Sequence, residues 1–121
     1  MAAVGRLQAV VLDCPDTRVL AEFYRELLGW KVAYDEPGVW VTLSNDGPIT
    51  LCLQQVADYQ PPQWPGQQHP QQFHLDLTVD DLDTAEQQAL ALGATKAEPQ
   101  PAPSSYRVML DPAGHPFCLC R

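Results

Sequence analysis

The chain has 121 residues, the length of one compact domain, and 45% of them are hydrophobic while 18% are charged. This balance fits a folded protein and argues against intrinsic disorder. The formal net charge is −8, from 15 acidic and 7 basic residues, so nucleic acid is not an expected partner. Apolar runs stay well short of the roughly 20 residues of a membrane helix. The N-terminal stretch lacks the pattern of a signal peptide. We therefore expect a cytoplasmic protein with no membrane partner.

The first half of the chain predicts one helix among four strands. An apolar stripe at helical spacing follows Asp16, which is a good N-cap, and Gly29 ends the predicted helix. Apolar or alternating runs bounded by Asp, Asn, Pro and Gly predict strands at 7–12, 30–34, 39–43 and 49–56.

The second half predicts the same order of elements after a long connection. Residues 57–72 are rich in Pro and Gln, which excludes a regular element and indicates a linker or a functional loop. A second amphipathic stripe predicts a helix at 82–92, which Gly93 ends. The predicted strands of this half lie at 73–79, 95–97, 106–110 and 116–120.

The two halves form an internal repeat. A shift of 64 residues places Asp16 on Asp80 and Gly29 on Gly93, and each half reads strand, helix and three strands. We therefore predict one α+β domain made of two βαβββ modules, at 5–56 and 73–121, joined by the linker 57–72. The two modules should form a curved mixed sheet shaped as a cup, with a helix on the outer face of each module.

Three motifs indicate a known family. They are FYRELLGW at 23–30, HLDLTVDD at 74–81 and DPAGHPF at 111–117. In this order, on a doubled βαβββ repeat, they resemble the vicinal oxygen chelate superfamily, which includes glyoxalase I, bleomycin-resistance proteins and extradiol dioxygenases. The chain is most similar to the glyoxalase-like branch. The resemblance implies a small-molecule ligand in the cup and a homodimer.

Strand alternation assigns side chains to the open face of each predicted sheet. The odd positions of 73–79 are apolar, so Phe73 and the other apolar residues should pack on the helix. The 64-residue shift pairs Leu75 with Val11, so Gln8 and Val10 of the first strand should face the cup. The residues that we expect to bind a ligand there are His74, Trp40, Cys52, Gln54, Asp76, Tyr106 and Cys118. Trp64, in the Pro-rich loop, could stack on a flat ligand or pack over the domain or into a partner chain.

The family's metal site is not reproduced by the residues that match it. Metal-dependent members use His or Gln, Glu, His and Glu from the first, fourth, fifth and last strands. By resemblance, His74 matches the third ligand, Cys52 and Cys118 replace the two Glu, and the first position falls on Ala9 or Val10. We therefore expect no cofactor. A divalent metal held by His74, Cys52 and Cys118 is the alternative, with Asp76 as a possible base.

Three functions remain open on the sequence. The first is binding of a small organic ligand without a standard metal site. The second is a metal-dependent lyase, isomerase or dioxygenase. The third is a partner-binding module without catalysis, so the sequence leaves open whether the protein is an enzyme. The four cysteines are expected to be free thiols.

Overall fold

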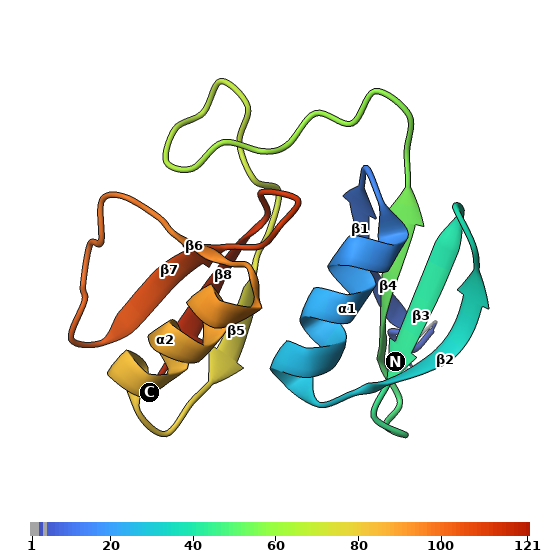
Figure 1. Ribbon diagram of the computed structural model, residues 1–121, viewed down its shortest axis with the longest axis horizontal. Coiled ribbons are helices and arrows are strands. Elements are labelled where there is room, and N and C mark those ends of the chain that lie inside the picture. The colour runs from blue at the N-terminus through green and yellow to red at the C-terminus, as the bar shows by residue number, and fades with distance from the viewer. Residues whose placement is uncertain (1–2, 4) are drawn as a thin grey trace. The chain divides into compact units, whose positions relative to one another are not determined.

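The structure is a computed structural model that describes residue 3 and residues 5–121. Its elements follow the predicted βαβββ order twice, which confirms the α+β fold class (Figure 1). The first module contains β1 (Ala9–Cys14), α1 (Thr17–Leu28), β2 (Lys31–Glu36), β3 (Trp40–Ser44) and β4 (Thr50–Gln55). The second contains β5 (Leu75–Thr78), α2 (Leu82–Leu92), β6 (Thr95–Lys96), β7 (Tyr106–Leu110) and β8 (Pro116–Cys120).

Contacts divide the chain into two units, the first ending at Tyr59 and the second beginning at Gln60. Most of the predicted linker, 60–72, therefore belongs with the second module. Neither helix in the described part of the chain is long and apolar enough to cross a membrane.

Both sheets have the same topology. The strand orders are β1-β4-β3-β2 and β5-β8-β7-β6. The first strand of each module pairs in parallel with the last, and the remaining pairs are antiparallel, so both sheets are mixed. A parallel pair needs a crossover connection, which the helix and the intervening strands provide.

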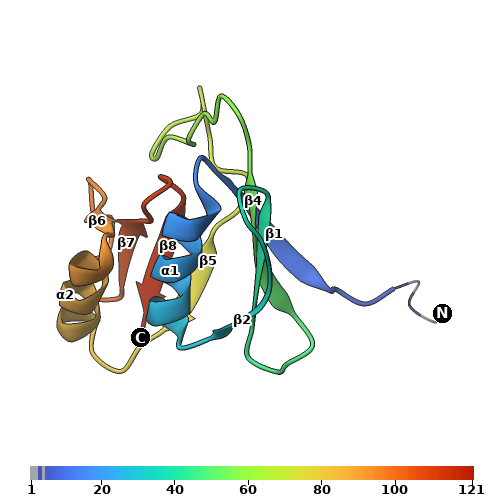
Figure 2. The same cartoon turned by 45° about the vertical axis from the view of Figure 1, so that its right-hand side comes forward.

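One face of each sheet packs against the helix of its module. The side chains on the other face, the open face, point away from that helix. In the first module α1 contacts β3 and β4. The buried residues of these elements include Leu20, Phe23, Tyr24, Leu43 and Leu53. In the second module α2 contacts β6, β7 and β8 (Figure 2). The buried residues there include Leu82, Ala89, Met109, Phe117 and Leu119.

The helix ends follow the predicted chemistry with one correction. The Asp16 carboxylate accepts a hydrogen bond from the Arg18 N–H at 2.9 Å, which confirms this N-cap. The N-cap of α2 is Asp81, one residue after the Asp80 that the 64-residue shift aligns with Asp16, and its carboxylate accepts a hydrogen bond from the Thr84 N–H at 2.8 Å. Gly29 ends α1 with a φ of 69°, a conformation that favours glycine.

This correction also overturns the predicted face of the first strand. α1 has 12 residues and α2 has 11, so a shift of 64 aligns the C-terminal ends of the helices but neither their N-terminal ends nor the strands before them. Val11 pairs with Cys52 as Asp76 pairs with Cys118, which is a shift of 65. Val10 instead pairs with Leu51, on the helix side, and Gln8 precedes the strand. The open face of β1 therefore carries Ala9, Val11 and Asp13.

The fifth strand is shorter than predicted. Its pairing begins at Leu75, so Phe73 and His74 lie in the segment before it. Phe73 is 61% exposed and does not pack on the helix, contrary to the prediction. The alternation of apolar and polar residues in the sequence starts before the point at which the hydrogen-bonded ladder begins.

Candidate functional site

Four of the predicted cup residues surround one pocket of the second module. They are His74, Asp76, Tyr106 and Cys118. The pairing that places two of them together is the parallel register of β5 and β8, in which Asp76 lies opposite Cys118. Side chains at paired positions share a face, and Tyr106 reaches the same face because it pairs with Cys120 on β8.

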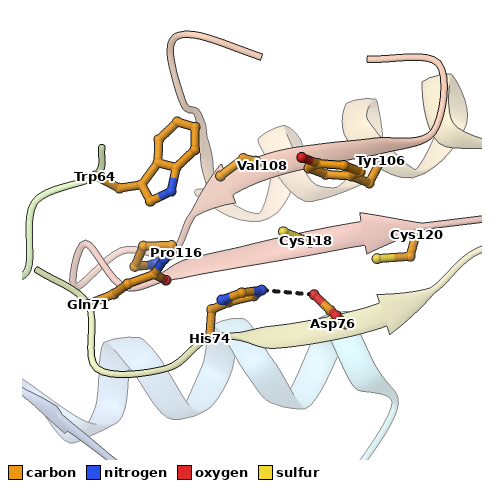
Figure 3. Close-up of a pocket in the computed structure, with 9 residues that line it drawn as sticks. All are labelled: Trp64, Gln71, His74, Asp76, Tyr106, Val108, Pro116, Cys118 and Cys120. Carbon is orange, nitrogen blue, oxygen red and sulfur yellow. Dashed lines mark ion pairs between the residues drawn. The ribbon is translucent and has the colours of Figure 1, made fainter. Parts of the chain in front are cut away.

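The pocket has a volume of about 240 Å³. Figure 3 shows its residues arriving from β5, β7, β8 and the loop before β5. It is lined by Trp64, Gln71, His74, Asp76, Tyr106, Val108, Pro116, Cys118 and Cys120. This volume lies near the lower end of small-molecule sites, so it suits a ligand of one or two rings.

The walls of the pocket are apolar and partly aromatic. Ala97, Val108 and Cys118 form a buried cluster, and Trp64 and Tyr106 pack against it. Trp64 thus fixes the Pro/Gln-rich loop to the open face of the second sheet. Of the alternatives raised for Trp64 by the sequence, packing over the domain is the one that the structure shows.

One side of the pocket is polar. A carboxylate oxygen of Asp76 lies 3.2 Å from Nε2 of His74, and the Asp76 side chain is 63% exposed (Figure 3). Burial and, to a smaller extent, the negative charge of Asp76 raise the pKa of the Cys118 thiol to about 11. Burial and Asp76 also raise the pKa of Cys120. Both thiols therefore keep their protons at neutral pH.

Gln71 adds an acceptor that sequence reasoning missed. Its side-chain oxygen Oε1 is buried and has no hydrogen-bond partner among the residues that the structure describes. Buried polar atoms in folded proteins nearly always have a partner, so an unpaired acceptor in a pocket lining points to a donor that the described residues do not supply. Gln71 lies in a Gln-rich loop, where no periodicity or motif distinguishes it from its neighbours.

The remaining predicted residues lie in the first module. The Trp40 indole N–H donates to Oγ1 of Thr42 at 2.8 Å, and the Cys52 sulfur lies 3.5 Å from the same oxygen. Gln54 pairs with Trp40 across β3 and β4. Trp40, Cys52 and Gln54 therefore share the open face of the first sheet. None of the four cysteines, all of which the structure describes, is part of a disulfide bond, as predicted.

The donor chemistry does not fit the four-ligand metal site that the resemblance implies. Ala9 has no donor atom, and Cys52 and Cys118 carry thiols in place of carboxylates. A different group does form within the second module, where a nitrogen of His74, an oxygen of Asp76 and the sulfur of Cys118 all lie within 4.8 Å of one another. This group includes the residue that we expected to act as a base, and Cys52 is not part of it.

Comparison with known proteins identifies the family. A model of the glyoxalase-like domain matches residues 9–120. The chain belongs to the glyoxalase-like domain family. This places it in the vicinal oxygen chelate superfamily, as the three motifs indicated. A search of curated proteins finds no match.

Solved structures confirm the glyoxalase-like fold. A possible glyoxalase from Bacillus cereus is 16% identical with a TM-score of 0.71, over 98% of this chain and 100% of that one. The fosfomycin resistance protein FosX from Mesorhizobium loti is 14% identical with a TM-score of 0.70, over 98% and 92%. A lactoylglutathione lyase from Agrobacterium tumefaciens is 22% identical with a TM-score of 0.62, over 95% and 92%. Identities this low establish the fold and leave the function to the site.

Proposed function

We propose that this glyoxalase-like protein binds a small, flat organic molecule in the pocket of its second module. The observation that carries the proposal is the two-sided lining of the pocket. Trp64 and Tyr106 offer aromatic surface, and Asp76 and Gln71 offer acceptors beside it. Apolar walls with a few convergent polar groups are the usual composition of a small-molecule site.

The names of the structural neighbours are compatible with binding and with catalysis. One is named as a resistance protein and another as a lyase. The chain lacks the ligand set of the family's metal centre, which supports binding without a standard metal site. The homodimer, the cytoplasmic location and the partner-binding alternative stay predictions.

A fragment screen tests the proposal. Flat aromatic fragments are added to the ¹⁵N-labelled protein, and the amide and indole N–H signals are followed by NMR. We expect hits to shift the Trp64 indole signal together with the amides of Tyr106 and Cys118. The Tyr34→Ala variant is a control that should leave these shifts unchanged, because Tyr34 is an exposed aromatic residue of β2 and does not line the pocket. A screen without hits, or with hits that leave these signals unchanged, contradicts the proposal.

A second candidate is a metal-dependent activity, which the grouping of His74, Asp76 and Cys118 favours. Imidazole, carboxylate and thiolate together suit Zn²⁺, which must displace the thiol proton to bind. Calorimetric titration of the metal-free protein with Zn²⁺ tests this candidate. It requires binding that His74→Ala weakens by about tenfold and His69→Ala, a change at an exposed loop residue, leaves intact. Absence of zinc binding, or equal binding by both variants, rules it out.

A further inference from the structure

The charges around the second-module pocket are unbalanced. Among the nine residues that line it, Asp76 is the one carboxylate, and none is Lys or Arg. The Asp76 carboxylate has His74 beside it, but its side chain lines the pocket and remains largely exposed. Cys118 and Cys120 are protonated thiols at neutral pH and add no charge. An anion entering this pocket meets a carboxylate and no fixed cation.

Arg107, which is next in sequence to two of the lining residues, is held on the other face of the sheet. Arg107 lies between Tyr106 and Val108 on β7, so alternation turns it toward α2. Its guanidinium lies 2.8 Å from Glu86 and 2.8 Å from Asp83. Lys96 of β6 also pairs with Glu86, at 3.3 Å. These pairs leave the pocket face of the sheet without basic side chains from β6 or β7.

The aromatic side chains in the pocket walls also favour a positively charged ligand. The faces of aromatic rings attract organic cations, and Trp is the strongest of the natural side chains in this respect. Trp64 and Tyr106 line the same pocket as the Asp76 carboxylate. Gln71 contributes a buried carbonyl oxygen that accepts no hydrogen bond within the described part of the chain. The lining therefore combines aromatic rings, one carboxylate and one unpaired acceptor.

We propose that the ligand is a flat organic cation with N–H donors, of the aromatic amidine or amine class. This inference rests on the proposed binding function and narrows it to one ligand class. The cationic group lies at the Asp76 carboxylate, and the ring lies against Trp64 and Tyr106. An N–H donor reaches Oε1 of Gln71 after a turn of the side-chain amide.

Three probes of nearly equal shape test the ligand class. Benzamidine is cationic, benzamide is neutral and benzoate is anionic. Their dissociation constants are measured by NMR titration at about pH 8, where imidazole side chains are ordinarily neutral. We expect benzamidine to bind about tenfold more tightly than benzamide, and benzoate to bind most weakly.

Two variants locate the preference. Asp76→Asn is expected to reduce the advantage of benzamidine over benzamide to about twofold or less, because the amide keeps the shape but not the charge. Asp80→Asn makes the same change at an exposed residue outside the pocket lining and should leave the advantage intact. The comparison of the three probes on the unaltered protein stands even if a variant fails to fold.

The outcomes separate this inference from the proposed function. Equal binding of benzamidine and benzamide, or tighter binding of benzoate, overturns the cation preference while ligand binding itself stands. The preference is also overturned if neutral fragments bind at the Trp64 signal and benzamidine does not. Failure of every probe and every fragment overturns both.

Discussion

Asp76 and Cys118 lie opposite each other on the parallel strands β5 and β8. Burial raises the pKa of the Cys118 thiol to about 11, and the Asp76 charge and a hydrogen bond to its carboxylate contribute to this value. A carboxylate thus borders a thiol that stays protonated. The pocket therefore carries a negative charge at Asp76, while the protonated Cys118 thiol is a poor nucleophile.

Cys118 should therefore react slowly with iodoacetamide at neutral pH. With a pKa of about 11, about one thiol in a thousand is ionised at about pH 8. The alkylation rate at Cys118, followed by mass spectrometry of its peptide, should rise about tenfold per pH unit toward that value. Asp76→Asn should speed the reaction several-fold at about pH 8, because a negative charge beside the thiol is removed. Rapid labelling of Cys118 in the unaltered protein at about pH 7 contradicts this assignment.

Trp64 should determine ligand affinity through its ring. Trp64→Ala removes one aromatic wall of the pocket, and benzamidine should bind about tenfold more weakly, as the loss of a desolvated cation–π contact implies. Trp64→Phe keeps a ring and should lose less. Both are measured by the same NMR titration as the probes. If Trp64→Ala binds as tightly as the unaltered protein, Trp64 is not part of the binding wall.

Glu86 should stabilise the second module in a pH-dependent way. Its side chain is buried, which opposes ionisation, but hydrogen bonds from Arg107 and Lys96 outweigh burial and lower its pKa. Because the folded pKa is the lower one, the stabilisation is present above the ordinary carboxyl pKa of about 4.3 and is lost as pH falls through the folded value. Glu86→Gln should cost about 1–3 kcal/mol at about pH 7, measured by urea denaturation.

The control for Glu86 is an exposed glutamate of the same module. Glu98→Gln should change the free energy of unfolding little at any pH, because Glu98 is exposed. The difference between Glu86→Gln and the unaltered protein should shrink once the pH falls below about 4. A constant difference down to about pH 3 shows that the ion pairs are not its source.

Asp111 should hold the turn between β7 and β8 through its carboxylate. Oδ1 accepts hydrogen bonds from the N–H groups of Ala113 at 2.8 Å and His115 at 2.9 Å, and the residue is 4% exposed. Asp111→Ala leaves two donors without this acceptor and should cost about 2–3 kcal/mol in thermal or urea unfolding. Asp111→Asn keeps an oxygen at the position and should cost less. Equal losses in the two variants show that the acceptor is not what matters.

The sequence predicts the bounds of strands closely where residues that favour turns mark the strand ends. β7 and β8 have the predicted bounds, Tyr106–Leu110 and Pro116–Cys120, because the Asp-Pro-Ala-Gly turn fixes both inner ends. The prediction for β5 was wrong at Phe73, since alternation does not reveal where strand pairing begins. The prediction that Val10 faces the cup was wrong because α1 is one residue longer than α2. A single offset between the two halves therefore cannot align both the helix C-termini and the strands before the helices.

The sequence predicted residues of the site that lie on strands, but it missed a residue of the site that lies in a loop. Alternation placed Asp76 and Cys118 on one face, and the structure has them paired. Gln71 lies in a segment without periodicity, so its buried position depends on contacts that only the folded module makes. The substitution of the family's carboxylates by Cys52 and Cys118 could be seen in the sequence, but the register that sets Asp76 directly opposite Cys118 could not.

The most direct test of the account is a crystal structure of the protein soaked with benzamidine. We predict electron density for the amidinium within hydrogen-bond distance of the Asp76 carboxylate, with the ring between Trp64 and Tyr106. An empty pocket at saturating benzamidine, or density for the compound only elsewhere on the protein, contradicts the assignment of this pocket as a site for a flat organic cation.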